Sequence, residues 1–222
     1  MRNQRLVVLV IVSVFIAGFI AATVAAQTAG ESVSALGKTW RISNRAVSET
    51  TVDGRAVLQF DERQGDGLAW LPDVQFSNGA IEFDARGRDV FQRSFLGVAF
   101  HGTDAETFDA VYFRPFNFRA TDPARRNHAV QYIAHPSHTW QKLRAERPEE
   151  FENPIDPPPD PNEWFHVRIV VASPRVAVFV NEATTPCLEV EQLSDRKTGW
   201  VGFWAGNGSG GQFANLRITA AK

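Results

Sequence analysis

Two apolar runs with a two-residue period, joined by a polar turn at residues 102–104, most constrain how this chain folds. Strand side chains alternate between the two faces of a sheet. One face therefore collects Leu96, Val98, Phe100, Val111 and Phe113, and the opposite face collects Gly97, Ala99, His101, Ala110, Tyr112 and Arg114. The pattern over residues 95–118 predicts a β-hairpin in the middle of a sheet. We expect its apolar face to pack against a second sheet and its mixed face to carry function.

The remainder of the chain favours the same architecture. Short alternating segments recur between turn signals such as Asp53-Gly54 and Asn78-Gly79, and helical periodicity is almost absent. We therefore predict an all-β fold over residues 38–222, a two-sheet antiparallel jelly-roll sandwich. The side chains expected between the sheets are Phe83, Val98, Phe100, Phe113, Val167, Ile169, Val178 and Phe203.

The N-terminus reads as a targeting segment. Arg2 and Arg5 precede an uncharged apolar run that ends in small residues, which is typical of a secretory signal peptide. We expect residues 1–26 to be removed, Gln27 to become the mature N-terminus, and residues 27–37 to form a linker. The protein would then be secreted or periplasmic. It would associate with a membrane only if the leader stayed uncleaved, because the run is long enough to span a bilayer.

The order of the segments from residue 74 to 218 resembles a known superfamily. Residues 76–84, 96–100, 164–169, 176–181, 201–204 and 213–218 are similar to successive strands of the concanavalin A-like lectin/glucanase sandwiches, including laminin-G-like domains. Bacterial secreted glycosidase-like sugar-binding domains are the most similar group. The resemblance implies the sandwich fold and a carbohydrate ligand. It does not fix one activity, because this fold hosts lectins, glycosidases and adhesion modules.

The mixed face of the hairpin offers candidate ligand-binding residues: His101, Tyr112, Arg114, Gln131 and His135. Aromatic rings stack on the apolar faces of sugars, and the other side chains supply hydrogen-bonding groups. These residues share one surface if their strands are neighbours. The alternative is a buried polar and aromatic layer that is covered by residues 135–162 and binds nothing.

Two strand carboxylates are weak catalytic candidates. Glu82 and Asp84 alternate on one strand, as acids do in glycosidases of this fold, and retaining hydrolysis needs two carboxyl groups about 5–5.5 Å apart. However, Ala85-Arg86 stands where the pattern expects a third acid. A solvated face or an ion pair with a nearby arginine is the alternative.

Metal and nucleic-acid partners have little support in the sequence. No compact set of metal ligands is visible, and only a structural calcium ion is suggested, by the resemblance. The net charge of −2 gives no reason to expect nucleic acid. The sequence thus leaves three hypotheses open: an exported carbohydrate-binding domain, a glycoside hydrolase-like enzyme that uses Glu82 or Asp84, and a protein-interaction module.

Overall fold

The computed structural model describes residues 31–221. The predicted signal peptide and its cleavage site lie outside these residues. No helix within the described range is long and apolar enough to cross a membrane.

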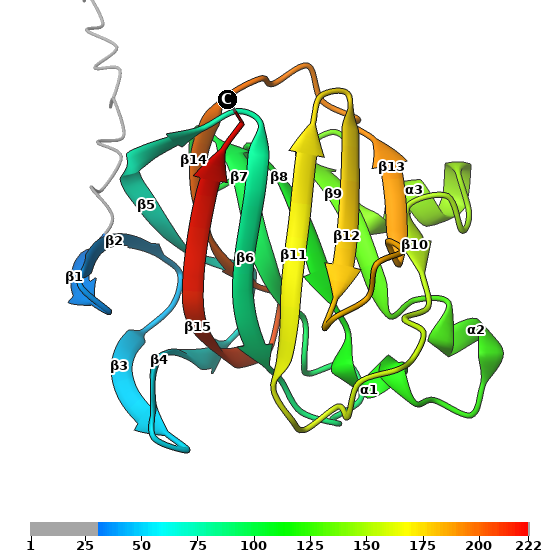
Figure 1. Ribbon diagram of the computed structural model, residues 1–222, viewed down its shortest axis with the longest axis horizontal. Coiled ribbons are helices and arrows are strands. Elements are labelled where there is room, and N and C mark those ends of the chain that lie inside the picture. The colour runs from blue at the N-terminus through cyan, green and yellow to red at the C-terminus, as the bar shows by residue number, and fades with distance from the viewer. Residues whose placement is uncertain (1–30, 222) are drawn as a thin grey trace, which may run out of the picture.

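Two antiparallel sheets pack face to face, with the seven-stranded sheet toward the viewer in Figure 1. The eight-stranded sheet contains, in spatial order, β1 (Glu31–Ala35), β2 (Lys38–Ser43), β5 (Gly67–Phe76), β14 (Gly199–Ala205), β7 (Leu96–Gly102), β8 (Phe108–Phe113), β9 (Val130–His135) and β10 (Glu152–Asn153). The seven-stranded sheet contains β13 (Leu188–Glu191), β12 (Arg175–Val180), β11 (Phe165–Ala172), β6 (Gly79–Arg86), β15 (Ser209–Ala220), β4 (Arg55–Arg63) and β3 (Val47–Val52).

Three short helices lie in the connections on either side of β9. Helices α1 (Pro115–Phe118) and α2 (Pro123–Arg126) link β8 to β9, and α3 (Trp140–Glu146) follows β9. Proline occupies the first turn of α1 and of α2, where its missing N–H costs nothing. Thr139 caps α3 by accepting a hydrogen bond from the Lys142 backbone N–H. The helices therefore lie beside the β8–β9–β10 end of the eight-stranded sheet (Figure 1).

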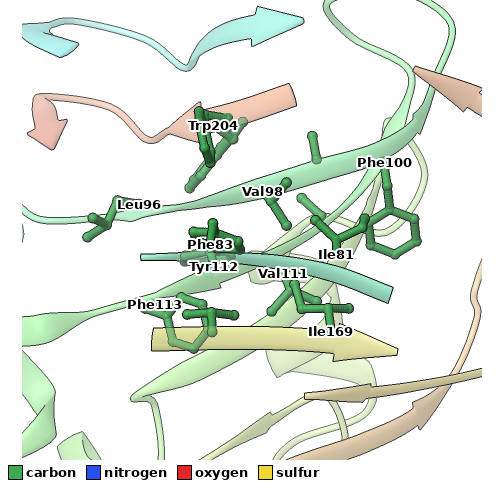
Figure 2. Packing of buried hydrophobic residues seen from close by; sticks show 14 of the residues in the cluster. Ile81, Phe83, Leu96, Val98, Phe100, Val111, Tyr112, Phe113, Ile169 and Trp204 are labelled. Carbon is green, nitrogen blue, oxygen red and sulfur yellow. The ribbon is translucent and has the colours of Figure 1, made fainter. Parts of the chain in front are cut away.

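The core forms where the sequence predicted it. All eight side chains expected between the sheets are fully buried, at 0% exposure. Figure 2 shows Ile81, Phe83 and Ile169 meeting Val98 and Val111 from the facing sheet. The predicted hairpin is β7–β8, with Val98 opposite Val111. The two-sheet antiparallel sandwich is thus confirmed.

Four edge strands escaped the sequence analysis, β1, β3, β10 and β13, of which β1 and β3 are the most exposed. Residues 31–35, which we expected in a linker, form β1 and pair in register with β2. Residues 47–52 form β3 and pair with β4. Both strands lie at sheet edges and are largely exposed, so their side chains carry little apolar alternation. Backbone pairing, rather than burial, holds such strands in place, and the β-branched residues of VSETTV are the only signal for β3.

Candidate functional site

A pocket of about 700 Å³ opens on the face of the eight-stranded sheet that points away from the other sheet. Strands β8, β9 and β14 supply its floor, α1, α2 and α3 supply residues of its walls, and two loops contribute Asp66 and the segment 91–95. Its lining comprises Asp66, Phe91, Gln92, Phe95, Tyr112, Arg114, Phe116, Asn117, Arg125, His128, Ile133, His135, Thr139, Trp140, Gln141, Arg144, Trp204, Gly206 and Asn207.

Two buried aromatic rings form the floor of the pocket. Tyr112 and Trp204 lie with ring centroids 4.9 Å apart and are only 2% and 4% exposed. Gly97 is paired with Tyr112 across β7 and β8, and a Cβ on Gly97 would lie 2.1 Å from the Val111 carbonyl oxygen. The close approach of these two strands at Tyr112 therefore requires glycine at position 97.

A hydrogen-bond network fixes the polar side of this floor. The Tyr112 hydroxyl donates to Gln131 Oε1 at 2.7 Å and accepts from Arg114 Nη2 at 2.6 Å. Arg114 also donates to Gln131 Oε1 and, at 2.9 Å, to the His128 carbonyl oxygen. Burial raises the pKa of Tyr112 to about 12, so the phenol is a neutral donor at physiological pH.

One buried carboxylate pairs with the cations around this network. The Glu152 side chain is 2% exposed and accepts two hydrogen bonds from Arg144, at 3.1 and 2.8 Å. Arg114 Nη1 lies 3.6 Å from Glu152 Oε2, and His128 Nδ1 lies 2.9 Å from Oε1. Burial lowers the pKa of His128, which favours its neutral form despite the nearby carboxylate. Glu152 comes from β10, so this edge strand joins α3 to the pocket floor.

Exposed aromatic side chains stand at the pocket rim. Phe91 is 57% exposed and Trp140 is 40% exposed, which is unusual for such large apolar groups. Each ring is covered by a guanidinium group: Arg125 lies 4.6 Å from the Phe91 centroid, and Arg144 lies 5.0 Å from the Trp140 centroid. The rim therefore presents apolar surface beside cationic donors.

The pocket also holds two ionisable groups with opposite pKa shifts. Loss of solvation raises the pKa of Asp66, although part of this residue remains exposed, and the charges of His135 and Arg45 oppose that shift. Burial lowers the pKa of His135, and Asp66 opposes it. The surroundings thus disfavour the charged form of both groups, and both are candidates for proton transfer.

Four of the five predicted ligand-binding residues belong to this region. Tyr112, Arg114 and His135 line the pocket, and Gln131 is buried beneath it as the acceptor for the first two. The expectation that His101 shares their face is wrong. It has a positive φ of 50°, and the pairing of β14 with β7 shifts register beside it. Its Nε2 contacts the Ser77 carbonyl oxygen at 2.8 Å, and its Nδ1 lies 3.7 Å from Asp109 on the buried side of β8.

The weak catalytic candidates lie on the other side of the molecule. Glu82 and Asp84 point outward from the seven-stranded sheet, away from the pocket. Asp84 pairs with Arg55 at 2.9 Å and contacts His166 Nδ1 at 2.8 Å, while Glu82 lies 3.4 Å from Arg217. This arrangement fits the ion-pair interpretation of these two acids.

Sequence reasoning missed most residues of the site, among them Asp66, Phe91, Trp140 and Glu152. Phe91 stands in a polar loop, where an isolated large apolar residue is the signal that could have found it. No sequence pattern predicted the burial of Glu152, because its edge strand has only two residues and shows no alternation. Within residues 31–221, no group of three or more side chains is arranged to hold a metal ion.

The family model for the 3-keto-alpha-glucoside-1,2-lyase-like domain matches residues 30–219. The chain belongs to this family. The match begins before residue 38, so the 3-keto-alpha-glucoside-1,2-lyase-like domain includes β1. No curated protein matches the sequence.

Solved structures with the same fold include carbohydrate-binding proteins. The domain resembles carbohydrate-binding module CBM66 from Bacillus subtilis, with a TM-score of 0.57, 16% identity and coverage of 82% of this chain and 95% of that one. It also resembles the VIP36 exoplasmic/lumenal domain bound to Ca²⁺ and Man3GlcNAc, with a TM-score of 0.53, 11% identity and coverage of 82% and 85%. The domain therefore has the concanavalin A-like lectin/glucanase fold, and the laminin-G-like part of the resemblance stays a prediction.

Proposed function

We propose that the pocket on the eight-stranded sheet binds a carbohydrate. The observation that carries the proposal is the combination of aromatic surface at the floor and rim with fixed hydrogen-bonding groups between them. A sugar ring has an apolar face that stacks on an aromatic ring and hydroxyl groups that need directional partners. A volume of about 700 Å³ is ordinary for a small-molecule site. CBM66 is named a carbohydrate-binding module and VIP36 is bound to Man3GlcNAc, which supports the same class of ligand for this pocket.

The rim tryptophan gives a direct test. Calorimetry against a panel of plant and bacterial polysaccharides should detect binding to the wild type. Trp140→Ala should weaken it about 5- to 150-fold, if a sugar stacks on one aromatic ring as strongly as a nucleic-acid base does, which is about 1–3 kcal/mol. Trp164→Ala is the matched control, because Trp164 is also stacked with an arginine, Arg55 at 4.7 Å, but lies on the seven-stranded side. Absence of heat with every polysaccharide, or equal loss in both variants, would count against the proposal.

A second candidate function is a lyase activity on 3-keto-glucosides. The family name and the Asp66–His135 pair favour it. In such a 1,2-elimination, a base removes the proton from C2, which is acidic because it lies beside the ketone. The electron pair forms the C1–C2 double bond, the C1–O bond breaks, and the departing oxygen takes up a proton. His135, whose neutral form is favoured, is suited to accept the first proton, and the Asp66 carboxyl group, whose pKa is raised, is suited to deliver the second.

Release of the alcohol from a 3-keto-glucoside measures this activity. We expect His135→Gln and Asp66→Asn each to lower the rate at least 100-fold, the range of one general acid or base. His166→Gln, on the seven-stranded sheet, is the control and should keep the wild-type rate. Full activity in His135→Gln would refute the assignment of the base, and no release by the wild type would leave sugar binding as the function.

A further inference from the structure

The cations of the pocket are not all neutralised. Three arginines, Arg114, Arg125 and Arg144, line it, whereas the nearby carboxyl groups are Asp66 and Glu152. Glu152 is shared by Arg114 and Arg144. Even with Asp66 ionised, the pocket keeps an excess of positive charge. Such a site favours an anionic ligand, and the effect is enhanced where a concave wall excludes water.

Arg125 is the cation that lacks an anionic partner among the described residues. Its Nη2 donates to the Phe116 carbonyl oxygen at 2.8 Å, and its Nε donates to Asn117 Oδ1 at 3.3 Å. Its guanidinium group also rests on the Phe91 ring. All three contacts are neutral, so they hold the guanidinium in place without cancelling its charge. Its Nη1 donates to no group of residues 31–221, which leaves that edge free for a ligand.

We propose that the pocket selects a sugar that carries a carboxylate, and that Arg125 binds this carboxylate. The inference rests on the proposed carbohydrate function and narrows it to acidic sugars such as uronic acids. A guanidinium group matches a carboxylate in shape and charge, and its hydrogen bonds are stronger than those between neutral groups. Because Arg125 is already held by neutral contacts, little side-chain freedom is lost when the ligand binds.

Two sugars that differ only at C6 separate this inference from sugar binding in general. Methyl α-D-glucuronide and methyl α-D-glucoside are titrated into the full domain and followed by NMR of the backbone amides. We expect the glucuronide to bind at least tenfold more tightly at low salt, and the difference to shrink as sodium chloride screens the charge. Arg125→Gln should lower glucuronide affinity about tenfold more than it lowers glucoside affinity.

Arg126→Gln is the matched control. Arg126 is on the same short helix, is exposed, and is not among the residues that line the pocket, so both affinities should stay at wild-type values. Equal binding of the two sugars by the wild type would overturn the anion preference while sugar binding stands. A glucuronide preference that survives Arg125→Gln would overturn the role of Arg125. If neither sugar shifts any amide, the acidic-sugar inference fails, and the polysaccharide panel separately decides whether carbohydrate binding fails with it.

Discussion

Replacing Glu152 by glutamine should strongly lower the free energy of unfolding, although the two side chains have the same size. The glutamine keeps the size of the side chain but removes the negative charge on which Arg114, Arg144 and His128 converge. The Arg114 side chain is 5% exposed and cannot regain water. Breaking a buried ion pair by removing one partner costs about 3–5 kcal/mol.

In the variant, Arg114 keeps three neutral acceptors: the Tyr112 hydroxyl, Gln131 Oε1 and the His128 carbonyl oxygen. The expected loss is therefore near the lower end of this range, at about 3 kcal/mol. A loss of about 3 kcal/mol lowers the melting temperature of a domain of this size by roughly 6–12 °C. Urea denaturation followed by tryptophan fluorescence, together with calorimetric melting, measures both quantities. Glu150→Gln is the control, because Glu150 pairs with Arg147 at the surface. The Glu150→Gln protein should melt at the same temperature as the wild type. A Glu152→Gln protein as stable as the wild type would refute the argument that this carboxylate compensates buried cations.

Three further outcomes are expected. Phe113→Ala should cost about 3–5 kcal/mol in denaturant unfolding, because the ring is fully buried between the sheets; a neutral result would contradict the face assignment. Burial lowers the pKa of His135 below its ordinary 6.5, so the unfolded chain binds more protons, and the unfolding free energy should fall as pH drops below about 6.5. His135→Gln should flatten that slope in melts at pH 5 to 8, and an unchanged slope would show that His135 does not titrate there. We also propose export with cleavage before Gln27, which mass spectrometry of secreted protein checks; a mass that retains Met1 would favour a membrane anchor.

The fold was predictable where the sequence carried a local period. Val98, Phe113 and Ile169 could be placed in the core because strand alternation fixes the face of each side chain once a strand is recognised. The exposed edge strands β1 and β3 were missed because they bury almost nothing. Alternation also failed at His101, where a positive φ and a register shift turn the side chain toward Asp109.

The site was predictable only in part, for the same physical reason. Tyr112, Gln131 and His135 share a face because β8 and β9 pair in register, and the alternating pattern contains that information. Arg114 was predicted on the same face, as a ligand-binding residue, but its partner Glu152 could not be predicted, because it comes from a two-residue strand with no period. The rim residues Phe91 and Trp140 come from connections whose placement depends on tertiary packing rather than on local sequence.

Sugar binding in this pocket can be tested by following the tryptophan indole N–H signals in an NMR titration with the tightest-binding sugar of the panel. The chain has six tryptophans, so the indole signals can be assigned by single substitutions. Trp140 and Trp204 line the pocket, whereas Trp164 packs against Arg55 on the seven-stranded side. We predict that the Trp140 and Trp204 signals move with the added sugar while the Trp164 signal stays in place. Movement of the Trp164 signal, with Trp140 and Trp204 unaffected, would contradict it.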